Sequence, residues 1–313
     1  MSLAFVFPGQ GSQSIGMLDQ LATEYPLVQE TFIEASDALG YDIWELVTSG
    51  PDVALNQTER TQPAMLAAGI AVWRVWQSLT NIHPGYLAGH SLGEYTALVA
   101  AGALSFTDAI KLVEMRGQFM QQAVPEGQGA MAAILGLDDN AVKMICIDAA
   151  DEQVVEAVNF NSPGQVVIAG NVEAVTKATE LAKEQGAKRA LLLSVSVPSH
   201  CALMKPAAEK LAEAITDTPV HKTRIPVLHN VNVSAAADEN EIKALLIQQL
   251  HNPVRWVETI QALSDTGVDK IVECGPGKVL AGLTKRIDKT ITGLPVFDQR
   301  SLEKAVQALG EEV

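Results

Sequence analysis

Residues 85–101 read GYLAGHSLGEYTALVAA and place a short apolar run, a G-x-S-x-G motif and an alanine-rich helical pattern one directly after another. The run at 85–89 is too short for a helix and favours a buried strand. A sharp turn from strand to helix projects a serine hydroxyl outward, and the two glycines remove side chains that would crowd it. Backbone N–H groups at the helix start then face whatever the serine attacks. The stretch predicts Ser91 as a nucleophile in an α/β fold; the alternative is a Gly-Ser turn that only starts a helix.

The rest of the chain alternates apolar runs of strand length with patterns of helical spacing. The run at 3–7 stops at Pro8 and predicts a first strand. Pro63 fits the first turn of a helix at 62–79. Such alternation implies a mostly parallel sheet covered by helices on both faces. Further strands are expected at 225–230, 270–274 and 292–297, and further helices at 26–39, 92–101, 106–123, 202–215, 239–250, 253–265, 279–286 and 302–309.

A segment in the middle of the chain follows a different order. Its apolar and helical patterns run β-α-β-β-α-β, which is the ferredoxin-like arrangement. We therefore expect a large α/β-hydrolase-like subdomain at 1–125 and 197–313, with a small ferredoxin-like subdomain inserted at 126–196. The strands of the insert are expected at 130–135, 154–160, 166–169 and 189–195, and its helices at 138–149 and 172–184.

The composition excludes several classes of function. The chain has 313 residues, 48% of them hydrophobic, and a formal net charge of −15. This supports a sizeable core but makes non-specific binding to nucleic acid or an anionic membrane a poor expectation. The N-terminal run lacks a basic segment, and no uncharged apolar stretch reaches the ~20 residues that a membrane span needs. Cys146, Cys201 and Cys274 are far apart and never spaced C-x-x-C. We expect a cytoplasmic protein without a metal site or disulfide framework.

A serine nucleophile needs a base, and the chain has six histidines. His200 directly follows the last strand of the insert, where the chain returns to the large subdomain. Composition alone does not separate it from the other five. A serine hydrolase would also need an Asp or Glu between Ser91 and the histidine. The candidates Asp138, Asp139 and Asp148 lie in the insert and outside any motif, which weakens a plain hydrolase interpretation.

Two other features bear on chemistry. The loop Gly9-Gln10-Gly11 fails the G-x-G-x-x-G dinucleotide pattern because its sixth position is Ser14. It indicates either a loop that brings backbone N–H groups to an oxyanion or a structural turn. Arg116 lies in the apolar helix at 106–123, with Met120 four residues on and hence on the same face. Spacing alone predicts a solvated arginine; one that pointed inward would need a carboxylate or phosphate partner.

Taken together, these motifs resemble the malonyl-CoA:acyl carrier protein transacylase family (FabD family) of bacterial type II fatty-acid synthesis. The resemblance covers nearly the whole chain, and the joint order of the motifs is far more specific than any one of them. The stretches that carry it are Phe7-Pro8-Gly9-Gln10-Gly11-Ser12-Gln13, Thr61-Gln62-Pro63-Ala64, Gly89-His90-Ser91-Leu92-Gly93-Glu94, Met115-Arg116-Gly117, Asn159-Phe160-Asn161-Ser162-Pro163-Gly164-Gln165, Pro198-Ser199-His200 and Glu273-Cys274-Gly275-Pro276-Gly277.

The resemblance implies a role for individual residues. Ser91 would be the acylated nucleophile, and His200 its general base and acid. The backbone carbonyl of Gln249 would orient the imidazole, which explains the missing carboxylate. Arg116 would bind the free carboxylate of malonate. The backbone N–H groups of Gln10 and Leu92 would form the oxyanion hole, and Gln62, Met120, Asn159 and Asn161 would lie near the site.

The resemblance also implies the reaction and its partners. The chain would transfer malonyl from malonyl-CoA to the phosphopantetheine thiol of holo acyl carrier protein through a malonyl-Ser91 ester, as a monomer and without a cofactor, since the CoA thioester is a substrate. A serine esterase or thioesterase, and a non-catalytic acyl-binding module, remain alternatives. Acyl carrier proteins are acidic, so docking would need a local basic patch. The candidates are Lys188, Arg189, Lys278, Lys285, Arg286 and Lys289.

Overall fold

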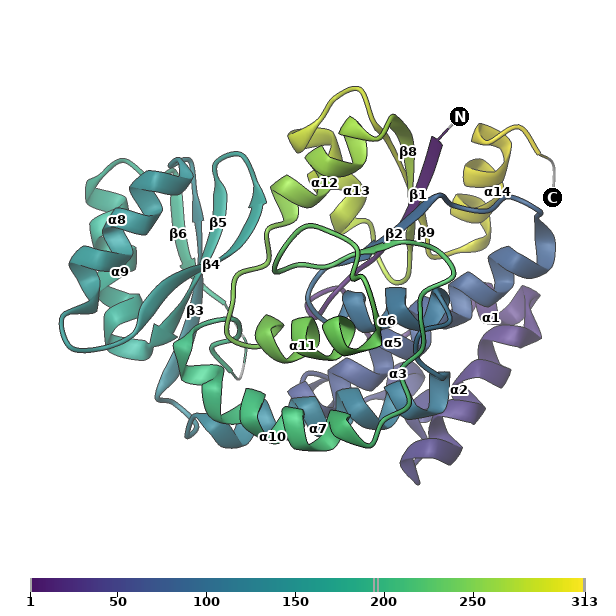
Figure 1. The fold of residues 1–313 in the computed structure, drawn as a ribbon, viewed down its shortest axis with the longest axis horizontal. Helices are drawn as coiled ribbons and strands as arrows, with labels where there is room; N and C mark the ends of the chain where they lie inside the picture. The colour runs from purple at the N-terminus through teal and green to yellow at the C-terminus, as the bar shows by residue number, and fades with distance from the viewer. Residues whose placement is uncertain (1, 194, 196, 312–313) are drawn as a thin grey trace.

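The computed structural model describes residues 2–193, 195 and 197–311, which are built around two β-sheets (Figure 1). The larger sheet has the strand order β7-β2-β1-β8-β9, and each of its strand pairs is parallel. The predicted mostly parallel sheet is therefore confirmed. Its strands are β1 (Ser2–Phe7), β2 (Tyr86–Gly89), β7 (Val227–Leu228), β8 (Val268–Cys274) and β9 (Thr292–Val296).

Helices cover both faces of this sheet, as a buried parallel sheet requires. Along β1, Phe5 and Phe7 belong to the core on one face, while Ala4 and Val6 belong to the core on the other. The second face is covered by α12 (Trp256–Asp265) and α13 (Val279–Ile287). The core on the first face also contains residues of α1 (Asp19–Glu24), α2 (Pro26–Leu39), α3 (Ile43–Ser49), α4 (Asp52–Leu55), α5 (Thr58–Leu79), α6 (Gly93–Ala100), α7 (Phe106–Ala123), α10 (Lys205–Thr216), α11 (Glu239–Gln249) and α14 (Gln299–Ala308).

The smaller sheet has the order β4-β5-β3-β6 and is antiparallel throughout. Two helices pack on it, and the chain order β-α-β-β-α-β with this strand order is ferredoxin-like, as predicted. Figure 1 shows this subdomain beside the larger one. The predicted strand at 189–195 is shorter, and residues 194 and 196 lie outside the described residues. The elements are β3 (Gly129–Leu135), α8 (Asp139–Ala150), β4 (Val155–Ser162), β5 (Gln165–Asn171), α9 (Val172–Glu184) and β6 (Arg189–Leu192).

Several predicted boundaries were wrong. Helix α5 begins at Thr58, so Pro63 lies in its interior and not in its first turn. Residues 58–61 form the first turn of this helix and are all polar. The apolar spacing that predicted the helix begins only after them, so the predicted start was too late. The strand expected at 225–230 ends at Leu228, because the next two residues turn away to bond with a buried carboxylate described below. The expected helix at 202–215 opens with a 3₁₀ turn at Ala202–Met204, and that at 253–265 begins only at Trp256.

The two subdomains are joined by backbone hydrogen bonds next to the start of α12. The N–H of Phe160 donates to the carbonyl of Val254 at 3.0 Å, and the N–H of Val254 donates to the carbonyl of Val158 at 2.8 Å. These bonds place the β4 strand of the small sheet against the large subdomain. None of the helices in the described residues is long and apolar enough to cross a membrane.

Candidate active site

Ser91 lies on a tight turn between β2 and α6, in the left-handed backbone conformation with φ of 52°. The two glycines of the motif are sterically required. A Cβ at Gly89 would lie 1.9 Å from the carbonyl of Gly93, and a Cβ at Gly93 would lie 2.0 Å from the carbonyl oxygen of Phe7. The left-handed conformation of Ser91 is uncommon for a non-glycine residue, and such residues cluster at functional sites. The predicted strand–turn–helix is therefore present, with Ser91 at its apex.

His200 lies beside the serine, although 109 residues separate them in the chain. Its Nε2 is 2.7 Å from Ser91 Oγ, and its Nδ1 is 2.7 Å from the backbone carbonyl oxygen of Gln249. A carbonyl only accepts, so Nδ1 carries the proton and Nε2 is the acceptor that faces the serine hydroxyl. The arrangement is that of a nucleophile and its base, with a carbonyl in the place of the usual carboxylate.

Burial and the positive charge of Arg116 lower the pKa of His200 from 6.5 to about 3. The imidazole is therefore neutral, and able to accept a proton, far below neutral pH. We expect kcat/KM for acylation of Ser91 to stay level from about pH 5 to pH 8, whereas a histidine with an unperturbed pKa would lose activity near that pKa. A carboxylate bound in the cavity would offset the charge of Arg116 and raise this pKa, so for an acyl donor that carries one the acid limb of kcat should lie at higher pH than that of kcat/KM. Initial rates across this range test the first point, and a limb in kcat/KM near pH 6.5 would contradict it. Rates extended below pH 5 test the second point, which a limb in kcat at or below that of kcat/KM would contradict.

Arg116 is buried, so the solvated arginine predicted from spacing was wrong. The apolar face of α7 turns it inward with Met120, and both line the same cavity. Its Nη1 donates to Gln62 Oε1 at 2.6 Å and its Nη2 to Gln249 Oε1 at 3.0 Å. No ion pair among the described residues includes Arg116, and its Nε has no hydrogen-bond partner there. Burial lowers the pKa of this guanidinium, and nearby Tyr95 and Glu94 offset only part of that effect; a carboxylate in the cavity would stabilise its charge further.

A cavity of about 100 Å³ connects these groups. Gln10 and Leu92 form part of its wall, and in the described part of the chain neither of their backbone N–H groups donates a hydrogen bond. The Gln10 side chain instead donates to Thr58 at 3.3 Å. The cavity is lined by Gln10, His90, Ser91, Leu92, Arg116, Met120, Met131, Asn159, Leu193, Val195, Val197, Ser199 and His200.

The remaining predicted residues lie around this cavity in different ways. Asn159 is on its wall, and its buried Oδ1 has no partner among the described residues. Asn161 is not on the wall; its Oδ1 lies 2.8 Å from His90 Nε2 and ties the small subdomain to the residue before the nucleophile. Gln62 lies behind Arg116, and its Nε2 donates to Met120 Sδ at 3.5 Å.

Sequence reasoning missed three buried polar residues beneath the serine. Glu94, His229 and Asn230 are all fully buried, and both His229 and Asn230 are hydrogen-bonded to the Glu94 carboxylate. Glu94 stands in the motif around Ser91, but a glutamate in the first turn of a helix is ordinary. His229 and Asn230 carry no local signal, because their meeting with Glu94 depends on a strand that is distant in sequence.

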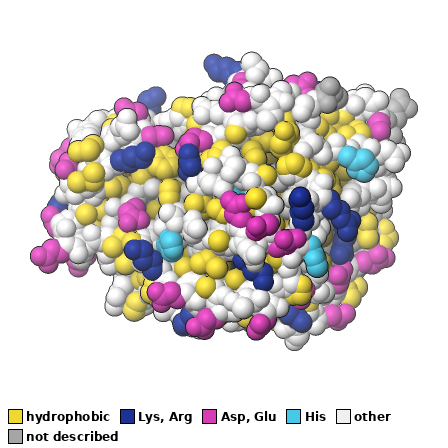
Figure 2. Space-filling model, viewed as in Figure 1, with side chains coloured by type: hydrophobic (Ala, Val, Ile, Leu, Met, Phe, Trp, Pro, Cys, Tyr) yellow, Lys and Arg dark blue, Asp and Glu magenta, His cyan; other side chains and the backbone are white. Residues whose placement is uncertain are grey.

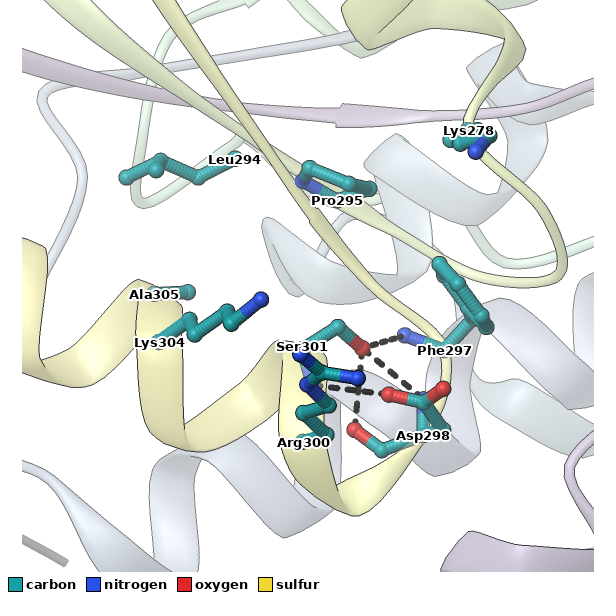
Figure 3. Close-up of a pocket in the computed structure, with 9 residues that line it drawn as sticks. All are labelled: Lys278, Leu294, Pro295, Phe297, Asp298, Arg300, Ser301, Lys304 and Ala305. Atoms are coloured by element: carbon teal, nitrogen blue, oxygen red, sulfur yellow. Dashed lines mark hydrogen bonds between the residues drawn. The ribbon is translucent and has the colours of Figure 1, made fainter.

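A larger cavity of about 500 Å³ lies away from the serine, between β9 and α14 (Figure 3). Lys278, Arg300 and Lys304 line it and are exposed. Asp298 also lines it, and its carboxylate accepts the N–H of Ser301 as the cap of α14. No nucleophile and base meet there, so we assign no chemistry to it. In the part of the chain that the structure describes, no group of three or more His, Cys, Asp or Glu side chains is placed to hold a metal ion.

The fold and the serine–histidine–arginine arrangement define a serine-dependent acyl transferase class. A family model described as acyl transferase domain matches residues 4–296. Malonyl CoA-acyl carrier protein transacylase of Haemophilus influenzae is 57% identical over 98% of this chain and 98% of that protein, and that of Escherichia coli K12 is 55% identical over 97% and 98%. The chain therefore belongs to the malonyl CoA-acyl carrier protein transacylase family, as the sequence motifs predicted.

Solved structures agree with this assignment. The malonyl CoA-acyl carrier protein transacylase (FabD) of Coxiella burnetii superposes with a TM-score of 0.98 at 51% identity, covering 99% of this chain and 98% of that one. A second structure, a type II PKS acyl-carrier protein in complex with its malonyl-transacylase, matches with a TM-score of 0.97 at 54% identity, covering 98% of this chain and 100% of that one. The matches span both subdomains.

Proposed function

We propose that this chain transfers the malonyl group from malonyl-CoA to the phosphopantetheine thiol of an acyl carrier protein, through an ester on Ser91, in fatty-acid biosynthesis. The observation that carries this proposal is the single cavity that holds Ser91, His200 and Arg116 together. A serine and its base alone would suit any acyl ester. The buried, unpaired guanidinium supports an acyl group that ends in a carboxylate.

In the first half-reaction, His200 Nε2 takes the proton of Ser91 as Oγ attacks the thioester carbonyl. The carbonyl oxygen becomes an oxyanion, for which the free N–H groups of Gln10 and Leu92 are the available donors. Loss of one such donor typically costs about 3 kcal/mol of transition-state stabilisation. The carbon–sulfur bond then breaks, CoA leaves as a thiol with the proton from His200, and malonyl remains on Ser91.

The second half-reaction runs the same steps in the opposite direction. His200 takes the proton of the pantetheine thiol, the sulfur attacks the Ser91 ester, and the serine oxygen leaves with that proton. Thioesters are exchanged for thioesters, so the overall transfer is close to isoenergetic. The shielded cavity and the hold of Arg116 on the carboxylate favour the oriented thiol over water. No step of this proposed mechanism needs a cofactor. We also propose that the protein acts as a monomer in the cytoplasm.

Product analysis separates this function from its alternatives. The protein is mixed with malonyl-CoA and holo acyl carrier protein, and both proteins are followed by intact mass. We expect a malonyl adduct on this chain and then on the carrier. Free malonate without malonyl carrier protein would indicate an esterase or thioesterase. Binding without any adduct would indicate an acyl-binding module.

We propose that the carrier protein docks where the two subdomains meet. Arg189 opens β6, and Leu193 just beyond that strand lines the cavity. Across the junction, Arg286 Nη1 donates to Gln165 Oε1 of the small subdomain at 2.8 Å. Lys285 precedes it and is exposed. Lys278 lines the separate β9–α14 cavity (Figure 3), which makes it a weaker candidate.

Charge reversal at Lys285 tests this surface. Figure 2 shows Lys and Arg side chains interspersed with Asp and Glu over the face in view. The test therefore reverses one lysine charge at a time and compares two positions. Lys285→Glu should lower kcat/KM for the carrier protein about 2- to 10-fold, because rim charges act mainly on association, and should leave acylation by malonyl-CoA unchanged. Lys111→Glu, at an exposed lysine on α7, is the matched control. Equal values of kcat/KM for the carrier protein in the two variants would show that Lys285 is not part of the docking surface.

A further inference from the structure

Glu94 is a fully buried carboxylate that the acyl-transfer steps do not use. It is the second residue of α6 and accepts three hydrogen bonds. The donors are His229 Nδ1 at 2.7 Å, the Asn230 backbone N–H at 2.8 Å and Gln249 Nε2 at 2.9 Å. A buried carboxylate is costly unless its oxygens are bonded in this way, so the three donors and Glu94 hold one another in place.

Two of these donors also hold the backbone of the nucleophile. Ser91 N–H donates to Asn230 Oδ1 at 2.8 Å, and Gln249 Nε2 donates to the Ser91 carbonyl at 3.0 Å. Asn230 Nδ2 donates to the carbonyl of Gly89 at 2.7 Å. Ser91 has a positive φ, a conformation that persists only where the surroundings hold it. Asn230 and Gln249, which both bond to Glu94, therefore fix the N–H and the carbonyl of Ser91 by hydrogen bonds.

Gln249 extends the same network to the arginine. Its Nε2 faces Glu94, and its Oε1 accepts from Arg116 Nη2 at 3.0 Å. If the amide were turned over, its N–H₂ would face the guanidinium donors and its oxygen would face the carboxylate, and both contacts would be repulsive. Glu94, the Ser91 carbonyl and Arg116 therefore favour the same orientation of this amide, and Glu94 is the charged member among the acceptors of Nε2. The backbone carbonyl of the same residue holds His200, so one residue contacts both the base and the arginine.

We propose that Glu94 is a positioning residue for substrate selection: by fixing the Gln249 amide, it aims the Arg116 guanidinium at the carboxylate of a diacid acyl group. This rests on the proposed malonyl transfer and adds a cause for its selectivity. The charge of Arg116 already favours an anionic acyl group over neutral acetyl. Held from behind by Gln62 and Gln249, the guanidinium also presents a fixed fork that can make paired contacts to the carboxylate, which increases the preference for malonyl over acetyl.

The chain offers a conservative variant that should keep the network. In Glu94→Gln, the amide oxygen can accept from Asn230 and Gln249, while the new N–H₂ faces His229 Nδ1. That nitrogen can become an acceptor if the proton moves to Nε2, which has no partner among the described residues. Glu94→Ala removes the carboxylate acceptor, so on the Nε2 side the Gln249 amide keeps the Ser91 carbonyl and a longer contact to Asn230 Oδ1, and its orientation is held less firmly.

The test compares acylation by malonyl-CoA and acetyl-CoA in the wild type, Glu94→Gln and Glu94→Ala, with the melting temperature of each. We expect the malonyl-to-acetyl ratio of kcat/KM to fall about 10- to 100-fold in Glu94→Ala, the range for one lost charge-assisted hydrogen bond, and to stay near the wild-type value in Glu94→Gln. A structural role alone would lower the melting temperature or both acylation rates together. An unchanged ratio in Glu94→Ala would overturn the proposal.

A second variant keeps the test decisive if Glu94→Ala does not fold. Gln249→Met retains the backbone carbonyl that holds His200 and removes only the amide between Glu94 and Arg116. It should show the same selective loss with malonyl-CoA, and an unchanged ratio would again overturn the proposal. If the wild-type protein forms no malonyl adduct, the proposed function itself is wrong. If it forms the adduct but the variants keep the wild-type malonyl-to-acetyl ratio, only the proposed role of Glu94 is wrong.

Discussion

Ser91→Ala is expected to abolish the malonyl adduct and all transfer to the carrier protein. The ester cannot form without Oγ, and loss of a nucleophile that acts with its base typically costs on the order of 10⁴- to 10⁶-fold in rate. Intact-mass measurement after incubation with malonyl-CoA gives the result directly. Ser199→Ala is the matched control, because this second hydroxyl lines the same cavity without contacting His200 Nε2. An adduct that persists in Ser91→Ala and disappears in Ser199→Ala would show that the nucleophile was misassigned.

Arg116→Ala should remove most malonyl transfer and retain transfer of acetyl. Losing a buried charged partner of a carboxylate costs about 2–5 kcal/mol, roughly 30- to several-thousand-fold in kcat/KM for malonyl-CoA. Acetyl carries no carboxylate, so it loses only the packing of the cavity wall. Parallel acylation assays with the two CoA esters measure this difference.

The control for this arginine is Arg116→Lys, which keeps a charge but loses the planar fork. It should fall between the wild type and Arg116→Ala, because an ammonium group cannot make the paired contacts to Gln62, Gln249 and a bound carboxylate at once. Equal losses with malonyl-CoA and acetyl-CoA in Arg116→Ala would instead show that the arginine supports the fold and does not select the substrate.

Much of the fold was predictable because its signals are local. A strand buried on both faces is a short apolar run, as in β1, and a helix shows its spacing within a few turns, as in α2, α7 and α9, whose bounds were predicted correctly or nearly so. The glycines on either side of Ser91 are required because any larger side chain would clash, either with backbone a few residues away or with the adjoining strand. The ferredoxin-like order of the insert followed from the succession of such patterns.

Other features depend on contacts that no local pattern records. The polar first turn of α5 concealed its start, and the short strand β7 ends early because His229 and Asn230 are used by Glu94. The direction of Arg116 was predicted wrongly from spacing, since an arginine in an apolar helix is ordinarily exposed. Its burial is tolerated because two glutamine side chains, from α5 and α11, accept hydrogen bonds from its guanidinium and because Tyr95 and Glu94 favour its charged form.

The amino-acid sequence by itself determined the order of strands and helices, the sharp turn that exposes Ser91 and, through the joint order of its motifs, the family. Local patterns did not single out His200 among the six histidines, although the family resemblance implied it, and only the tertiary structure places its ring against that hydroxyl. Only the tertiary structure, too, shows that Glu94, Gln249 and Arg116 form one connected support beneath the cavity. The reason is physical. Backbone conformation and periodic burial are dictated by neighbours in the chain, whereas a buried polar contact exists only once distant segments have packed and excluded the water that would otherwise satisfy it.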